Sequence, residues 1–129
     1  MVKTSAVKWD EIVVKYRKQC QKIVNLFTCI RYTGVINAAY GRTLTGIVCP
    51  NVKPLLKSEH VKNEFFIIFT LITMRKDVVS TVGKLEHVIM QHQKVTIIIL
   101  QKKDTTYYIS VERKEKDLEN IISLIKKMI

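Results

Sequence analysis

The chain has 129 residues, of which 47% are hydrophobic and 26% are charged, so it can bury a core and is not a disordered chain. Its four glycines and two prolines exclude fibrous and low-complexity classes. This length predicts one domain over residues 1–129. The 22 Lys and Arg residues exceed the 11 Asp and Glu residues by 11, an excess that bears on binding partners rather than on the fold.

The cysteines and the N-terminal residues indicate a compartment. Cys20, Cys29 and Cys49 are odd in number and form no C-x-x-C pair, so a disulfide framework is not expected. The first ten residues contain no apolar stretch of the kind found in secretory signals. The most apolar run, residues 65–74, has half of the roughly 20 residues that cross a bilayer. We therefore expect a soluble, cytoplasmic protein that binds no membrane.

The first predicted element is a helix over about residues 5–26, where apolar residues recur at steps of three and four. Ser5 is its expected N-cap, and Cys20 lies on its apolar stripe as a small buried residue. Three lysines share the opposite side at helical spacing: Lys15, Lys18 and Lys22.

A β-hairpin is predicted next, from residues 29–37 and 43–49. Both segments lose the helical period, and the first alternates between two sides as a strand does. Residues 37–42 contain the Asn and Gly that a hairpin turn favours. Pro50 and Pro54 then bracket a short connection.

A second helix is predicted from about residue 58 to residue 81, ending before Gly83. It is apolar on nearly all sides, so it must be covered on more than one side, and a second copy of the chain is one source of cover. One alternative is a buried β-strand over residues 65–74, because aromatic and β-branched residues dominate there. Another is a core helix enclosed between the first and last helices of its own chain.

Three strands and a last helix complete the predicted order. The strands are residues 84–90, 95–100 and 105–111, and the middle one is apolar throughout, as expected of a strand buried on both faces. Residues 118–128 carry an amphipathic stripe. Five short strands joined mostly by tight turns predict an α+β fold with a five-stranded antiparallel sheet, helices on its faces, and the order α-β-β-α-β-β-β-α.

This order of elements resembles the roadblock/dynein-light-chain fold and is close to profilin-like and PAS-like domains. The hairpin Gly34–Gly46 is similar to the first roadblock hairpin. The chain also resembles, over about residues 20–125, an uncharacterised family of small proteins from ammonia-oxidising archaea. The segments that carry this second resemblance are Ile30–Asn37, Pro54–Leu56, Met74–Asp77 and Ile109–Glu112. The resemblance implies a module that dimerises and serves small GTPases or larger complexes as a platform, by analogy of fold.

Motifs for catalysis, metals and cofactors are not found. The histidines and cysteines lack metal-ligand spacing, so no metal site is predicted. No nucleophile motif occurs, and the glycines at 41 and 46 are explained by a turn and a strand rather than by a phosphate loop. We predict no enzyme, no cofactor and no catalytic residue.

Two surfaces are predicted instead. The apolar second helix predicts a homodimer interface, made of Phe65, Phe66, Ile68, Phe69 and Ile72. No acidic residue occurs between Glu11 and Glu59, and the basic residues of this stretch predict contact with an anionic partner, either an acidic protein or a nucleic acid. The patch predicted for that partner is Lys15, Arg17, Lys18, Lys22 and Arg42. A solvated helix face explains the same charges without a partner.

The sequence therefore favours a non-catalytic, self-associating scaffold or regulatory module of roadblock-like type. One alternative is a nucleic-acid-binding protein that uses the basic face of the first helix. A second alternative is a PAS-like small-molecule sensor.

Overall fold

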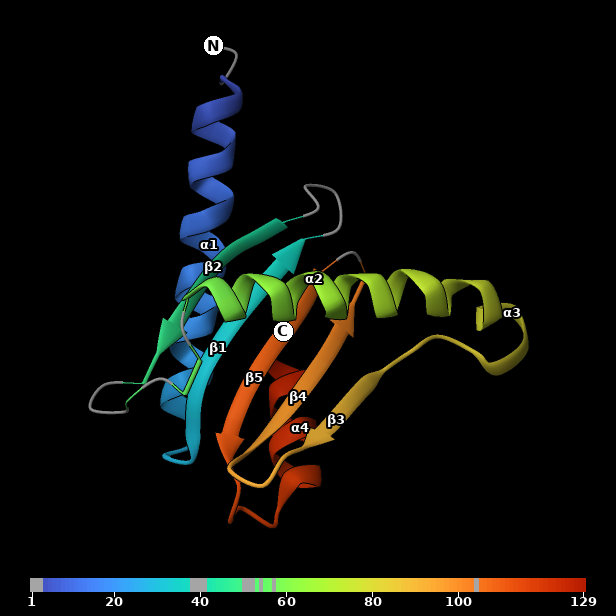
Figure 1. The fold of residues 1–129 in the computed structure, drawn as a ribbon. Helices are drawn as coiled ribbons and strands as arrows, with labels where there is room; N and C mark the ends of the chain where they lie inside the picture. Colours follow the sequence, from blue (N-terminus) through green and yellow to red (C-terminus); the bar gives the residue numbers. More distant parts are fainter. Residues whose placement is uncertain (1–3, 38–41, 50–52, 54, 57, 104) are drawn as a thin grey trace.

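The computed structural model describes residues 4–37, 42–49, 53, 55–56, 58–103 and 105–129 (Figure 1). The elements follow the predicted order, with one short extension of the second helix. In chain order they are α1 (Ser5–Leu26), β1 (Ile30–Asn37), β2 (Arg42–Val48), α2 (Ser58–Arg75), the 3₁₀ helix η1 (Lys76–Val78), α3 (Val79–Val82), β3 (His87–Gln91), β4 (Val95–Lys102), β5 (Thr105–Glu112) and α4 (Leu118–Met128).

The five strands form one antiparallel sheet in the order β2-β1-β5-β4-β3. The N-terminal hairpin and the C-terminal three strands are joined where β1 pairs with β5, with Val35 opposite Tyr107. This places β5 at the centre and leaves β2 and β3 at the edges. The predicted α+β fold with a five-stranded antiparallel sheet is confirmed.

Helices α1 and α4 cover one face of the sheet. Each has an amphipathic stripe, and burying both stripes against alternate strand residues removes apolar surface from water. The Tyr107 hydroxyl on this face donates a 2.6 Å hydrogen bond to the Gln19 side-chain carbonyl of α1. The fully buried residues at the centre of this face are Cys20, Ile23, Ile30, Val35, Ile98, Ile109, Val111 and Ile125.

Helix α2 lies across the opposite face, as Figure 1 shows, and α2 with α3 projects beyond the sheet on the side of β3. The alternative of a buried strand over residues 65–74 is therefore wrong. The alternative of a helix enclosed between α1 and α4 is also wrong, because those two helices pack on the other face. The buried residues on the α2 face are Ile36, Phe65, Ile68, Ile72, Ile97, Ile99 and Tyr108.

Some predicted boundaries need correction. Helix α1 is capped by Thr4, not Ser5: the Thr4 hydroxyl oxygen accepts a 3.2 Å hydrogen bond from the Val7 backbone N–H, which satisfies an otherwise unpaired helical donor. Strand β3 starts at His87 rather than at residue 84, because β4 pairs with it only from that position. The second helix was predicted as one element to about residue 81, but α2 ends at Arg75 and is followed by η1 and α3. The helical segment as a whole ends before Gly83, as predicted, because the φ of 88° at this residue favours glycine.

Two predictions fall on residues that are not described. One is the hairpin turn predicted over residues 37–42, and the other is the connection predicted between Pro50 and Pro54. Residues 38–41, Pro50 and Pro54 lie outside the described residues.

Candidate functional site

One side of α2 is fixed to the sheet by an aromatic cluster. Phe65 of α2 meets Tyr108 of β5 edge to face, with ring centroids 5.1 Å apart. Tyr32 of β1 lies 6.0 Å from Tyr108 and 6.5 Å from Phe65. Burial raises the pKa of Tyr32 to about 12 and raises the pKa of Tyr108 as well, because the charged phenolate is poorly solvated there. The cluster is therefore a neutral packing unit that positions α2.

A pair of glycines makes room for this cluster. Gly34 of β1 stands opposite Gly46 of β2 in the hairpin. A Cβ atom at Gly34 would lie 2.6 Å from the Tyr32 hydroxyl oxygen and 2.8 Å from the Phe65 ring, and one at Gly46 would also meet the Tyr32 hydroxyl. The missing side chains thus form a notch that seats Tyr32 and allows Phe65 to approach the sheet. Gly46 is a strand glycine, as predicted, but its role in this notch was not foreseen.

The other side of α2 is apolar and exposed. The exposed fractions are 71% for Phe66, 61% for Ile67, 67% for Met74 and 40% for Leu71. No charged residue occurs from position 65 to position 74. Thr70 lies on the same side, and its hydroxyl donates a 2.9 Å hydrogen bond to the Phe66 carbonyl. We call Phe66, Ile67, Leu71 and Met74 the outer face of α2.

The predicted interface residues are divided between these two sides. Phe65, Ile68 and Ile72 are buried against the sheet of their own chain, so they offer little surface to a second copy. Phe66 is exposed and Phe69 is partly buried. The outer-face residues Ile67, Leu71 and Met74 were missed. Helical spacing could have found them, because they lie on the side opposite the row Phe65–Ile68–Ile72.

Four of the five residues of the predicted basic patch lie on α1. Lys15, Arg17, Lys18 and Lys22 are all exposed, and the Lys15 ammonium lies 5.3 Å from the ring centroid of Tyr16. Lys15, Lys18 and Lys22 recur at three- and four-residue steps, so the predicted stripe is present on the solvent side of the helix. Arg42 belongs to β2, the edge strand beneath α1.

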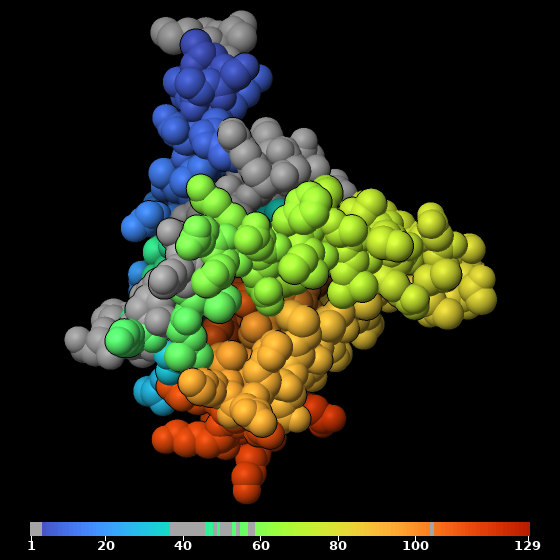
Figure 2. All heavy atoms as spheres, in the orientation of Figure 1, coloured from blue at the N-terminus to red at the C-terminus, as the bar shows by residue number. Residues whose placement is uncertain are grey.

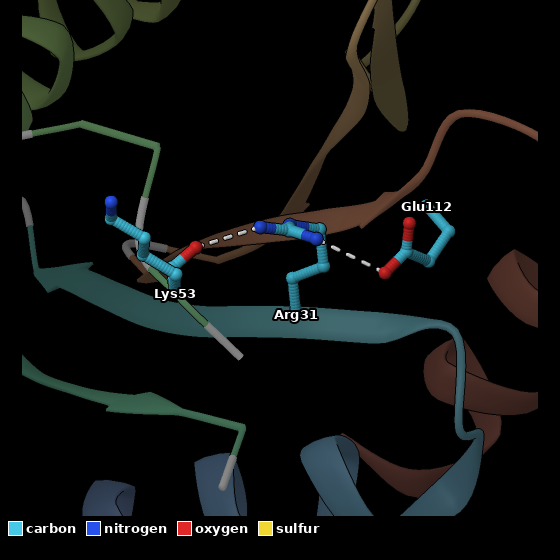
Figure 3. Close-up of polar contacts among 3 residues, drawn as sticks. All are labelled: Arg31, Lys53 and Glu112. Carbon is cyan, nitrogen blue, oxygen red and sulfur yellow. Dashed lines mark hydrogen bonds and ion pairs between the residues drawn. The ribbon is translucent and has the colours of Figure 1, made fainter. Parts of the chain in front are cut away.

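A polar contact near the start of β1 ties the connection before α2 to strands β1 and β5 (Figure 3). The Arg31 guanidinium donates to Glu112 of β5 at 3.0 Å and to the Lys53 carbonyl at 2.8 Å. Sequence reasoning missed this contact, because its three members are distant in the chain. The Arg31 guanidinium therefore holds the connection before α2 against the sheet. This structural role accounts for the contact without a ligand.

The cysteines are all free thiols. Burial raises the pKa of Cys20 to about 12, and burial together with Glu115 raises the pKa of Cys29 to about 11. A nucleophilic cysteine needs the opposite shift, toward the thiolate at neutral pH. Glu115 itself has a lowered pKa, chiefly because the Asp117 backbone N–H donates to its carboxylate at 3.0 Å. It holds the connection that precedes α4.

The described part of the chain contains neither a metal cluster nor a membrane span. Within residues 4–37, 42–49, 53, 55–56, 58–103 and 105–129, no three His, Cys, Asp or Glu side chains come together to hold a metal ion. Over the same ranges no helix is both long and apolar enough to cross a membrane.

A hollow of about 520 Å³ lies where the C-terminal end of α2 meets the edge of the sheet. It is lined by the end of β4, the segment Lys84–Glu86 and the end of α4, and most of its charged residues are basic. A second hollow of about 590 Å³ adjoins it along Lys84–Glu86. No local sequence signal points to either hollow, because the lining residues come from parts of the chain that are far apart.

Comparisons with known proteins show what this arrangement is similar to. No protein-family model and no curated protein sequence matches the chain. Among solved structures, the roadblock/LC7 domain of Streptomyces avermitilis is similar over 86% of this chain and 88% of its own, at 8% identity and a TM-score of 0.65. The gliding protein MglB of Thermus thermophilus is similar over 98% of this chain and 87% of its own, at 8% identity and a TM-score of 0.67. A structure of MglB in a tetrameric arrangement is similar over 98% of this chain and 86% of its own, at 8% identity and a TM-score of 0.69. These likenesses in structure, at such low identity, show that the chain has the roadblock/LC7 fold.

Proposed function

We propose that residues 1–129 form one cytoplasmic domain that acts as a non-catalytic, self-associating scaffold or regulatory module. The observation that carries the proposal is the outer face of α2, four large apolar side chains exposed to water on one side of one helix. An apolar row of this kind marks an interaction surface. The tetrameric arrangement of MglB, a protein of the same fold, supports an assembling role.

A second copy of the same face is the occupant we favour. Two helices bury apolar rows against each other when the rows lie at three- and four-residue spacing. In a two-fold dimer the same surface serves both copies, so one apolar row on α2 is sufficient. Figure 2 shows α2 and α3 standing out from the molecule, where a second copy can reach them. A partner such as a small GTPase would then bind to the assembled form. We also propose that the chain belongs to the archaeal family that it resembles in sequence.

Light scattering after size exclusion tests self-association. Phe66→Glu places a charge at the centre of the outer face, and we expect it to convert a dimer into a monomer at micromolar concentration. Val14→Glu is the matched control, because Val14 is also an exposed apolar residue of a helix, at 51% exposure, but lies on α1. A wild-type monomer, or equal effects of both changes, contradicts the proposal.

Nucleic-acid binding by α1 is the second candidate, and the four exposed cations of that helix favour it. Contacts to phosphates release counterions, so binding of a short RNA duplex should weaken steeply as salt rises. Lys15→Glu with Lys22→Glu should then abolish the binding. A duplex that does not bind at low salt removes this candidate. The PAS-like sensor stays a prediction.

A further inference from the structure

The hollow of about 520 Å³ at the end of α2, called the groove below, has an apolar floor and a basic rim. Its floor offers apolar surface mainly at Val79 and Leu85, which are half-buried. Ile72 and Leu100 also line it but are almost fully buried. Six cationic side chains and a single acidic side chain, Glu86, occur among its thirteen lining residues in the part of the chain that is described. The cations are Arg75, Lys76, Lys84, Lys102, Lys103 and Lys126.

Most of these cations have no internal partner among the described residues. Lys126 of α4 lies 3.7 Å from the Glu86 carboxylate and 3.1 Å from His87 Nδ1, and Lys102 donates to the Ile129 carbonyl. The other four, Arg75, Lys76, Lys84 and Lys103, are exposed and form no ion pair with any described residue. Like charges gathered in this way repel one another, and an anionic ligand would relieve the repulsion.

The fold, not the sequence order, brings these charges together. Helix α2 carries Arg75 past the sheet edge, and the positive φ of Gly83 ends α3 so that Lys84 returns toward β4. Lys103 reaches the same place from the turn after β4, where its φ is 54°. The charges therefore line the edge of the sheet beside residues 84–86, which precede the paired part of β3. One backbone hydrogen bond, 3.2 Å from the Gln101 N–H to the Glu86 carbonyl, links this segment to β4.

We propose that this groove binds a short acidic segment of a partner protein, with carboxylates on the rim cations and at least one apolar side chain on the floor. A compact phosphorylated ligand fits less well. Such a ligand needs converging donors and an enclosing cavity, whereas these cations come from separate elements around an open groove. The second hollow continues along Lys84–Glu86, which suits an extended chain with carboxylates along its length.

This site is separate from the outer face of α2. Phe66, Ile67, Leu71 and Met74 do not line the groove. The inference rests on the proposed role as a platform, because it specifies the chemistry of a partner of that platform. It does not require self-association. It also differs from the predicted basic patch, since none of the α1 residues contributes.

Fluorescence anisotropy with two labelled peptides tests the groove. The probe is a ten-residue peptide of alternating Glu and Leu, and its control replaces every Glu with Gln. Lys76→Glu with Lys84→Glu reverses two rim charges, while Lys15→Glu with Lys22→Glu makes the same change in net charge on α1. We expect saturable binding of the acidic peptide that weakens at least about tenfold in the groove variant and less than about threefold in the α1 variant. Circular dichroism verifies the fold, and Lys76→Gln with Lys84→Gln replaces the groove variant if it does not fold.

Each other outcome overturns the inference. Failure of the acidic peptide to bind, equal binding of the Gln peptide, or equal weakening by both variant pairs shows that the groove does not recognise an acidic segment. Displacement by tripolyphosphate at lower concentration than by unlabelled peptide assigns the site to a small anion, and displacement by a short RNA duplex assigns it to nucleic acid. Light scattering on the same samples reports self-association separately, so the two proposals fail independently.

Discussion

The two faces of the sheet are covered in different ways. On one face, α1 and α4 bury the centre of their apolar stripes, where Ile23 and Ile125 have no exposed surface. Toward the start of α1 the stripe is only partly buried, at Trp9 and Ile12. On the other face, α2 buries one apolar row but carries a second row outward, with Phe66 71% exposed. The centre of the first face, the α1–α4 face, is closed within one chain. The second face has apolar surface left over, and this surplus is the basis of the interface proposed above.

The polar residues of the helices reflect the same difference. The outward sides of α1 and α4 carry lysines and glutamates, which water solvates well. The middle of α2 carries none, and the hydroxyls of Thr70 and Thr73 are bonded to carbonyls of their own helix at 2.9 and 2.8 Å. The polar atoms of these threonines therefore do little to hydrate that face.

The largest expected effect on stability comes from comparing a buried residue of the α1–α4 face with an exposed residue of the outer face of α2. Ile98→Ala leaves a cavity under α1 and α4 and should lower the free energy of unfolding by about 3 kcal/mol at any protein concentration. Phe66→Ala should cost less than about 0.5 kcal/mol in dilute solution, because the side chain is exposed there. Its cost should grow with concentration, since association stabilises the folded state. Urea unfolding at two concentrations measures both, and concentration-independent losses of equal size would break the comparison.

A smaller effect is expected at the notch that seats the aromatic cluster. Gly34→Ala introduces a Cβ 2.6 Å from the Tyr32 hydroxyl oxygen and should destabilise the protein by about 2 kcal/mol. Hydrogen exchange should accelerate in α2 more than in α4, which packs on the other face. Tyr32→Ala in the same chain removes the closest contact and leaves only the one with the Phe65 ring, so the two changes together should cost less than their sum. Equal acceleration in both helices would show that the notch does not act on α2 alone.

The smallest effect on stability concerns the buried Cys20 thiol of the α1–α4 face. Burial raises the pKa of Cys20 from 9.0 to about 12, so above pH 9 the unfolded chain loses this proton while the folded chain keeps it. The free energy of unfolding is unaffected well below pH 9 and should fall as pH rises through 9, by about 1.4 kcal/mol at pH 10. Cys20→Ala should lack this decline, whereas lysine titration is common to both proteins. Urea unfolding at pH 8 and pH 10 measures the difference, and parallel declines would contradict the assigned burial.

Much of the fold was predictable because its signals are local. The stripe of residues 5–26 and the apolar run of residues 95–100 each follow from periodicity, and the resemblance to roadblock domains came from their order. The boundaries at Thr4 and His87 were missed because they depend on one cap and on strand pairing. For the candidate sites, the sequence located α2 and the α1 lysines but assigned three buried residues to the interface.

The sequence by itself determined most of the helices and strands, since periodicity and hydropathy are properties of neighbouring residues. It left residues 65–74 open between a helix and a buried strand, but showed that a helix there has more apolar surface than one sheet face can cover. The tertiary structure alone decided which row of α2 faces water, how Gly34 and Gly46 seat Tyr32, and how Arg75, Lys84 and Lys103 come to share a groove. These depend on the order of strands in the sheet and on the path of the chain around its edge, which bring together residues that are distant in the sequence.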